Sequence, residues 1–204
     1  MKILITGAKG MLGTQVALDL KRGYTELGAI PQAFVGADVV LADIDNLDIT
    51  DKAATEKFIA DCAPDVVINC AAYTNVDGCE SNQDTAFMVN GIGSRNLAIA
   101  CENVGAKLVH VSTDYVFKGD EPTPRREYDV TNPISVYGKT KNAGPSPAFF
   151  DYFSSSAQML KYALRRSSAG SHFSQMYSSF RKWLPPSPQR LHMGIRVTLS
   201  SKIQ

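Results

Sequence analysis

The chain has 204 residues, of which 44 % are hydrophobic and 20 % are charged, values that are ordinary for a globular protein. Its formal net charge of +1 does not indicate a nucleic-acid-binding protein. No segment approaches the ~20 apolar residues of a membrane span, and the apolar N-terminal run is short and followed by glycines, so we expect a cytoplasmic protein without signal peptide or membrane partner.

Short apolar runs alternate with amphipathic segments over the first two thirds of the chain. Because parallel strands need helical crossovers, this alternation predicts an α/β fold with a Rossmann-like, doubly wound parallel sheet. Asp51 is expected to cap a helix that turns Ala54, Phe58 and Ile59 inward. The predicted strands are residues 2–6, 37–42, 65–69 and 107–112, and the predicted helices are residues 12–21, 51–62 and 82–103.

Composition changes sharply near residue 144. Residues 1–144 carry 19 Asp and Glu against 13 Lys and Arg, whereas residues 145–204 carry one acid, 8 Lys and Arg, and 13 Ser. The second segment shows no clear strand or helix period. We therefore expect residues 1–144 to be the folded domain, with an incomplete C-terminal part and a poorly ordered basic tail. The tail is either an arm for an acidic partner or the product of a frameshift, and we favour the frameshift.

Gly7, Gly10 and Gly13 form a GxxGxxG pattern between the first predicted strand and the first helix. Glycine permits a tight turn and a close approach of the backbone to a pyrophosphate, and the helix N-terminus offers N–H groups to phosphates. Met11 and Leu12 begin that helix and are grouped with the glycines as cofactor-binding residues. The pattern predicts a site for NADH or NADPH.

The cofactor preference stays open on the sequence. Asp43, at the end of the second strand, is placed to accept a hydrogen bond from an adenosine ribose, which favours NAD. Lys9, inside the glycine loop, is instead suited to attract a 2′-phosphate. Asp48 is a candidate for contact with the adenine edge, and it is equally typical of an exposed residue before a helix.

Tyr137 and Lys141 are spaced i, i+4, which places both side chains on one helix face. A phenol with a pKa near 10 is a poor acid–base catalyst unless a neighbouring cation lowers that pKa, and Lys141 can supply the cation. Thr113 follows a predicted strand, where an open α/β sheet places its ligand. The three residues predict a reductase site in which Thr113 hydrogen-bonds the reacting carbonyl.

Several segments together resemble the extended short-chain dehydrogenase/reductase superfamily and, within it, the dTDP-4-dehydrorhamnose reductase family. They are GAKGMLG, PDVVINCAAYTNVDGCE, FMVNGIGSRNLA, VHVSTDYVFKG and NPISVYGKTK. The resemblance covers residues 1–144 and implies reduction of dTDP-4-dehydro-L-rhamnose to dTDP-L-rhamnose by NAD(P)H. It also implies that full-length relatives are homodimers.

The resemblance assigns roles to individual residues. Tyr137 would donate the proton, Lys141 would tune Tyr137 and bind ribose, and Thr113 would orient the carbonyl. Residues that would line the cofactor are Ala71, Ala72 and Tyr73, and weaker candidates near the substrate are Asn90, Asp114 and Tyr115.

The chain also departs from the family. The family's C-terminal sugar-nucleotide-binding domain is not recognisable after residue 144, so we expect a truncated chain that is inactive. Pro145 and Pro147 are expected to stop the catalytic helix within one turn of Lys141, leaving Lys141 in a frayed end. Some family members carry a glutamate that helps bind Mg²⁺ where this chain has Gln15, so no metal is expected.

Two other functions compete with a reductase. Proteins of this superfamily also serve as regulatory subunits of methionine adenosyltransferase, but a regulator does not need the complete set of Thr113, Tyr137 and Lys141. A sugar-nucleotide epimerase or dehydratase is disfavoured because such enzymes usually show an SSxxVYG-like segment in place of STDYVF.

Overall fold

A computed structural model describes residues 1–120, 124–126 and 129–144 of the chain. The interpretations of the tail as a basic arm or a frameshift product fall outside these residues. Four strands form one parallel sheet in the order β4-β1-β5-β6. This sheet confirms the predicted Rossmann-like class. The strands are β1 (Lys2–Thr6), β4 (Asp38–Ala42), β5 (Val66–Asn69) and β6 (Lys107–His110).

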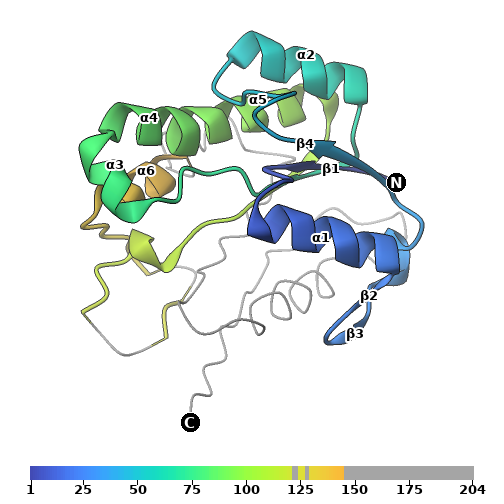
Figure 1. Cartoon of the computed structure of the whole chain (residues 1–204), viewed down its shortest axis with the longest axis horizontal. Helices are drawn as coiled ribbons and strands as arrows, with labels where there is room; N and C mark the ends of the chain where they lie inside the picture. The colour runs from blue at the N-terminus through green and yellow to red at the C-terminus, as the bar shows by residue number, and fades with distance from the viewer. Residues whose placement is uncertain (121–123, 127–128, 145–204) are drawn as a thin grey trace.

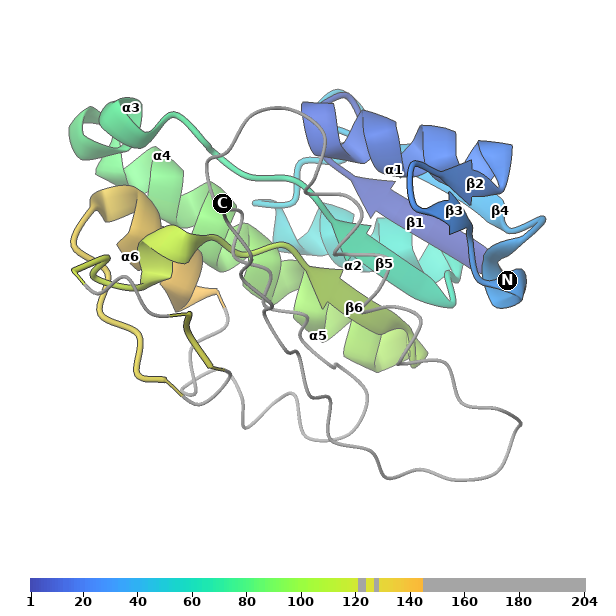
Figure 2. The same cartoon turned by 90° about the horizontal axis from the view of Figure 1, so that it is seen from below.

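Helices cover both faces of the sheet. Helix α1 (Met11–Arg22) lies on one face, and α2 (Lys52–Cys62) and α5 (Ser94–Val104) lie on the other (Figure 1). Two further helices, α3 (Val76–Ser81) and α6 (Val136–Ala143), lie beyond the ends to which the strands point (Figure 2). The chain runs from β1 through α1 to β4 on one side of β1 and then crosses to β5 on the other side. The order of the strands therefore reverses between β1 and β5, and such sheets place their ligands at this point.

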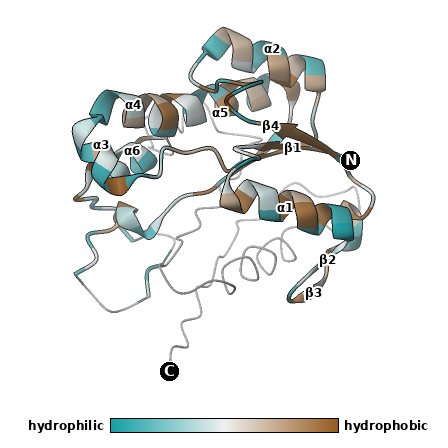
Figure 3. Ribbon diagram, viewed as in Figure 1, coloured by the Kyte–Doolittle hydropathy of each residue, from teal (hydrophilic) through white to brown (hydrophobic). Residues whose placement is uncertain are grey.

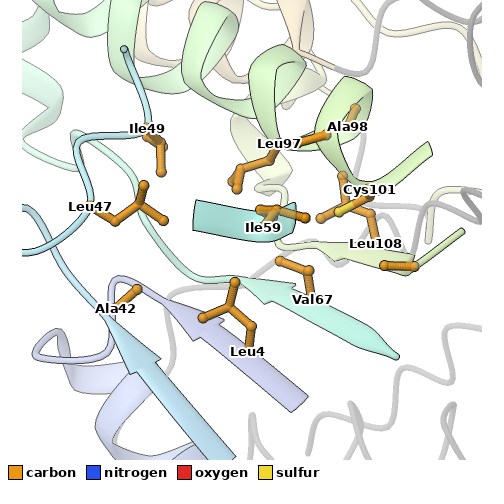
Figure 4. Packing of buried hydrophobic residues seen from close by; sticks show 12 residues of the cluster. Leu4, Ala42, Leu47, Ile49, Ile59, Val67, Leu97, Ala98, Cys101 and Leu108 are labelled. Atoms are coloured by element: carbon orange, nitrogen blue, oxygen red, sulfur yellow. The ribbon is translucent and has the colours of Figure 1, made fainter. Parts of the chain in front are cut away.

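The alternation of side chains along each strand divides the core in two. Ile3 and Ile5 of β1 pack toward Val16 and Leu20 of α1. Leu4, between them, faces the opposite layer. Figure 4 shows this second layer, in which strand and helix side chains interdigitate, and the hydropathy colouring of Figure 3 shows the strands as apolar. Members of the second layer include Val67, Leu108, Ile59, Leu97 and Cys101.

Helix α2 begins at the predicted cap. The Asp51 carboxylate accepts a hydrogen bond from the backbone N–H of Ala54 over 3.0 Å. Ile59 is fully buried, as predicted, but the prediction for Ala54 is wrong because its side chain is exposed. Thr55 turns inward in its place, and its hydroxyl is satisfied by the carbonyl of Asp51 over 2.7 Å.

The predicted helix 82–103 is present in three continuous pieces. Helix α4 (Gln83–Phe87) passes through a π-helical segment, η2 (Met88–Gly93), into α5. A wider π turn is typical of functional sites. A small antiparallel hairpin of β2 (Tyr24–Thr25) and β3 (Gly28–Ala29), which the sequence did not predict, follows α1. None of the helices in the described ranges is long and apolar enough to cross a bilayer.

Candidate functional site

The glycine loop packs directly on the backbone that follows β5. Gly7 has a φ of 65°, and a Cβ there would lie 2.5 Å from the amide nitrogen of Ala71. A Cβ on Gly13 would lie 2.2 Å from the carbonyl oxygen of Gly7. Both positions therefore require glycine, which has no Cβ. Met11 is 92 % exposed at the start of α1, whereas Leu12 packs against the core.

Asp43 lies beside this loop. Its carboxylate accepts hydrogen bonds from the backbone N–H of Lys9 over 2.8 Å and from that of Ile44 over 2.9 Å. The Lys9 ammonium forms an exposed ion pair with Asp45 over 2.8 Å. The loop after β1 and the loop after β4 are thus joined at one corner of the site.

Asp48 is exposed and bonded within its own turn. Its carboxylate accepts from the backbone N–H of Thr50 over 2.9 Å and from the Thr50 hydroxyl over 2.7 Å. This arrangement stabilises the turn that leads into α2. Its contact with adenine stays a prediction.

Tyr137 of α6 meets Thr113 at the end of β6. Burial raises the pKa of the Tyr137 phenol, and the interaction of the phenol with the Thr113 side chain opposes this rise. Tyr115 packs edge-to-face on the Tyr137 ring, with centroids 5.5 Å apart. Thr113 in turn donates to the carboxylate of Asp114 over 3.0 Å. Thr113, Asp114 and Tyr115 therefore all lie around the Tyr137 side chain.

Lys141 is held inside the protein. Its ammonium donates to the carbonyl oxygen of Val111 over 2.7 Å, and the residue is only 2 % exposed. Burial lowers the pKa of Lys141 to about 8. The expectation of a frayed end is wrong, because this contact and the surrounding packing fix the side chain although α6 ends at Ala143.

The tuning of Tyr137 by Lys141 stays a prediction. The pKa of Tyr137 is raised by burial, and Lys141 is not among the groups that shift it. Lys141 instead acts on His110, whose pKa is lowered far below its usual range by burial and then by the lysine charge. Tyr137 is consequently a protonated phenol at neutral pH.

Helix α6 is fixed at its start by polar groups. Ser135 caps it by accepting from the backbone N–H of Gly138 over 3.1 Å, and Glu80 of α3 accepts from Val136 over 2.8 Å. A Cβ on Gly138 would lie 2.2 Å from the carbonyl oxygen of Tyr115. The catalytic helix therefore packs closely on the segment that carries Thr113.

Asn90 joins the expected cofactor segment to the catalytic helix. It is fully buried in the π-helical segment, and its Oδ1 accepts from the N–H of Tyr73 over 2.9 Å. Its Nδ2 donates to the Tyr73 carbonyl and to the Thr140 hydroxyl, each over 3.1 Å. Thr140 donates to the carbonyl of Tyr137 over 3.0 Å. This geometry makes Asn90 a positioning residue; its proposed contact with substrate stays a prediction.

Asn69 is a second buried amide, and it was not among the predicted site residues. Its Oδ1 accepts from the Thr6 hydroxyl over 2.8 Å and from the N–H of Ala71 over 3.0 Å. Its Nδ2 lies 3.0 Å from Nδ1 of His110. Asn69 therefore joins β1, β5 and β6 where their carboxyl ends form the floor of the site. A polar residue at the end of an apolar strand is the signal that could have revealed it.

The residues present fit a dinucleotide. The packing around Gly7 and Gly13 leaves no room for a Cβ, so the loop keeps the tight glycine turn that lets a backbone approach a pyrophosphate. The N-terminus of α1 has no side-chain cap, so its N–H groups are suited to phosphate oxygens. Ala71, Ala72 and Tyr73 are half-buried beside the loop. The side-chain amide of Gln15 in α1 donates a hydrogen bond to the Asp19 carboxylate over 2.9 Å. In the described part of the chain, no group of three or more acidic, histidine or cysteine residues is placed to hold a metal ion.

Comparisons with known proteins agree with this site. Residues 1–147 match the family described as "RmlD substrate binding domain". A dTDP-4-dehydrorhamnose reductase of Mycobacterium tuberculosis is 46 % identical over 147 residues, which are 70 % of this chain and 44 % of that protein. The chain thus spans less than half the length of this curated relative.

Solved structures give the same relationship. A dTDP-4-dehydrorhamnose reductase of Clostridium acetobutylicum matches with a TM-score of 0.70 and 38 % identity, over 89 % of this chain and 60 % of that one. The Bacillus anthracis enzyme in complex with NADP matches with a TM-score of 0.69 and 33 % identity, over 88 % and 60 % of the two chains. The family match over residues 1–147 and these folds confirm the resemblance drawn from the glycine loop and the tyrosine–lysine pair, and the chain belongs to the RmlD substrate binding domain family.

Proposed function

We propose that this chain carries the cofactor site and the catalytic residues of an NAD(P)H-dependent reductase that converts dTDP-4-dehydro-L-rhamnose to dTDP-L-rhamnose. The observation that carries the proposal is the half-buried Tyr137 side chain, which lies beside Thr113 near the strand ends while Lys141 is fixed one helical turn further on. Such a set suits the reduction of a carbonyl, and the dTDP-sugar follows from the names of the relatives.

The residues would have separate roles in the reduction. When bound, a reduced nicotinamide supplies the hydride for the carbonyl carbon. The Tyr137 phenol, protonated at neutral pH, donates its proton to the carbonyl oxygen, and Thr113 orients that oxygen. Lys141 uses one N–H on Val111 and keeps two N–H donors for ribose hydroxyls. The glycine loop and Asp43 would hold the rest of the dinucleotide.

Cytoplasmic location and homodimeric assembly of full-length relatives belong to the same proposal. The two competing functions are less well supported. A non-catalytic regulator would have no use for a tyrosine and a buried lysine placed near the strand ends. The similar proteins quoted above are reductases rather than epimerases or dehydratases.

The test measures oxidation of NADH and NADPH with dTDP-4-dehydro-L-rhamnose. One arm uses the 204-residue chain, for which absent turnover stays our prediction. The other arm uses a chimera in which residues 1–144 replace the matching part of the Mycobacterium tuberculosis relative. The chimera is expected to turn over substrate, and Tyr137→Phe should reduce its rate by about 10²–10⁴-fold because the proton donor is lost.

Two outcomes would contradict the proposal. One is a folded chimera that binds dinucleotide but does not reduce the keto-sugar. The other is full activity of the Tyr137→Phe variant. Tyr24→Phe is the matched control, because Tyr24 is an exposed tyrosine in the hairpin after α1 and its hydroxyl is not part of the site.

A further inference from the structure

We propose that Asn69 is a positioning residue that couples the glycine loop to Lys141. It does so through two neighbours, Ala71 on the side of the cofactor and His110 on the side of the lysine. The inference deepens the proposed function and rests on it, since it takes the glycine loop as the cofactor site and Lys141 as part of the reductase site.

Asn69 is the middle residue of a polar row that crosses three strands. In the register of the sheet it lies beside Thr6 of β1 on one side and beside His110 of β6 on the other. All three side chains are buried, and each ends its strand. Because Thr6 precedes Gly7 and His110 precedes Val111, the row joins the strand that leads into the glycine loop to the strand that leads to the partner of the lysine.

The Oδ1 atom of Asn69 holds the cofactor side. It accepts from the Thr6 hydroxyl over 2.8 Å and from the backbone N–H of Ala71 over 3.0 Å. The glycine loop packs against this same amide nitrogen, because a Cβ on Gly7 would lie 2.5 Å from it. Asn69 therefore fixes the backbone on which the glycine turn rests.

The Nδ2 atom holds the lysine side. Because Oδ1 is occupied by two donors, the orientation of the amide is set, and Nδ2 faces Nδ1 of His110 over 3.0 Å. Nδ1 must then accept, which requires a neutral ring with its proton on Nε2. Burial lowers the pKa of His110 far below its usual range, in agreement with a neutral ring. Asn69 thereby fixes one tautomer and one orientation of the imidazole.

The residue after His110 supplies the carbonyl that receives the lysine. Val111 accepts from the Lys141 ammonium over 2.7 Å, and its own N–H donates to the backbone carbonyl of Asn69 over 3.2 Å. The Nε2 atom of His110 is buried and has no hydrogen-bond partner among the residues that the structure describes. An unpaired buried donor lowers stability, so a histidine here favours a role in positioning over one in stability.

The first measurement titrates the 204-residue chain with NADH and with NADPH and follows reduced-nicotinamide fluorescence. Asn69→Ala releases the amide of Ala71, so it should raise the Kd of the more tightly bound dinucleotide about fivefold. His110→Leu leaves the contacts of Oδ1 in place, so it should change this Kd by less than about twofold. The two variants therefore separate the cofactor side of Asn69 from its lysine side.

The second measurement is kcat for the keto-sugar in the chimera described above. His110→Leu removes the acceptor of Nδ2 and the unpaired Nε2 together, so the thermal midpoint should stay within about 4 °C of wild type. It should lower kcat about tenfold, because the lysine would lose its exact placement. His110→Gln offers a side-chain oxygen that can accept from Nδ2, so it should keep most of the wild-type kcat.

Thr55→Val is the matched control. Thr55 is fully buried, and its hydroxyl donates to the carbonyl of Asp51 over 2.7 Å at the start of α2. The substitution removes a buried hydrogen bond that has no part in the polar row. Its kcat and its Kd should therefore equal those of wild type within about twofold.

Three outcomes would overturn the inference while leaving the proposed function intact. They are a folded His110→Leu chimera with the wild-type kcat, a His110→Gln chimera as slow as His110→Leu, and losses in Thr55→Val equal to those in His110→Leu. If Asn69→Ala does not fold, the two His110 variants still decide between these results. A wild-type chimera that binds dinucleotide but does not reduce the keto-sugar would instead overturn the proposed function, and the inference with it.

Discussion

The Nζ of Lys141 donates to the carbonyl oxygen of Val111 over 2.7 Å at a point where the lysine is 2 % exposed. Such burial disfavours the charged form, and the pKa of Lys141 is lowered from 10.5 to about 8. In the unfolded chain the same lysine stays protonated until pH 10 or so. The folded state therefore bears a cost of about 3 kcal/mol at neutral pH for keeping this charge inside.

The pH dependence of stability follows from this shift. Between pH 8 and pH 9 the folded chain releases the Lys141 proton while the unfolded chain keeps it, so this group's contribution to stability rises with pH. The contribution of the buried thiols runs the other way: the pKa values of Cys70 and Cys101 are raised to about 12, so the unfolded chain ionises first as the pH passes about 9. The dependence of the total stability on pH therefore combines both contributions.

Comparison with Lys141→Met isolates the lysine. The cysteine contributions are common to both chains, so urea denaturation should show wild type gaining about 1 kcal/mol relative to Lys141→Met from pH 8 to pH 9. A constant stability difference across this range would show that Lys141 is not buried as a charged group.

A second prediction concerns the close approach at Gly7. Gly7→Ala should destabilise the chain by about 3 kcal/mol, because it adds both left-handed backbone strain and overlap with the backbone of Ala71. Gly36→Ala is the matched control. Gly36 has a φ of 73° with no heavy atom within 4 Å of an added Cβ. Gly36→Ala should therefore lower the free energy of unfolding by only about 1 kcal/mol. Equal losses in thermal or urea unfolding would mean that the loop does not pack on Ala71.

A third prediction tests Asn90 as a positioning residue. Asn90→Ala should lower the free energy of unfolding by about 3 kcal/mol. The substitution leaves the backbone amide and carbonyl of Tyr73 and the Thr140 hydroxyl without their partner Asn90. Asn132→Ala, at an exposed asparagine, should change stability by about 0.5 kcal/mol or less.

A readout of catalysis separates positioning from stability alone. In the chimera described above, Thr140→Val is expected to keep the fold and lower kcat more than it raises KM, because Thr140 bonds the carbonyl of Tyr137. An unchanged kcat in a stable Thr140→Val chimera would show that the contact from Asn90 through Thr140 does not position the tyrosine.

The sequence predicted the parts of the fold that depend on local periodicity. Leu12, Val16 and Leu20 recur at helical spacing and all contact the same core layer. The π-helical segment was not predicted, because its geometry depends on the tertiary contacts of Asn90 rather than on a sequence period. The β2–β3 hairpin was missed because two-residue strands carry no alternation to detect.

For the site, residue types were predictable and electrostatics were not. Tyr137 was selected by its spacing from Lys141 and Thr113 by its position after a strand, and the structure brings their side chains together. The partner of Lys141 was not predictable, because it is the main-chain carbonyl of Val111 and a carbonyl has no signature in the sequence. For the same reason the sequence placed the lysine charge on Tyr137, whereas burial decides the pKa of both side chains.

The measurement that tests the central claim most directly is binding of reduced dinucleotide to the 204-residue chain, followed by nicotinamide fluorescence with far-UV circular dichroism as the folding control. We expect saturable binding of NADH or NADPH by the wild-type chain and by Gly36→Ala. We expect this binding to be lost in Gly7→Ala, because the added Cβ would overlap the backbone of Ala71 and displace the glycine loop. A folded wild-type chain that binds neither cofactor, or a folded Gly7→Ala chain that binds as tightly as wild type, would contradict the assignment of this loop as a dinucleotide site.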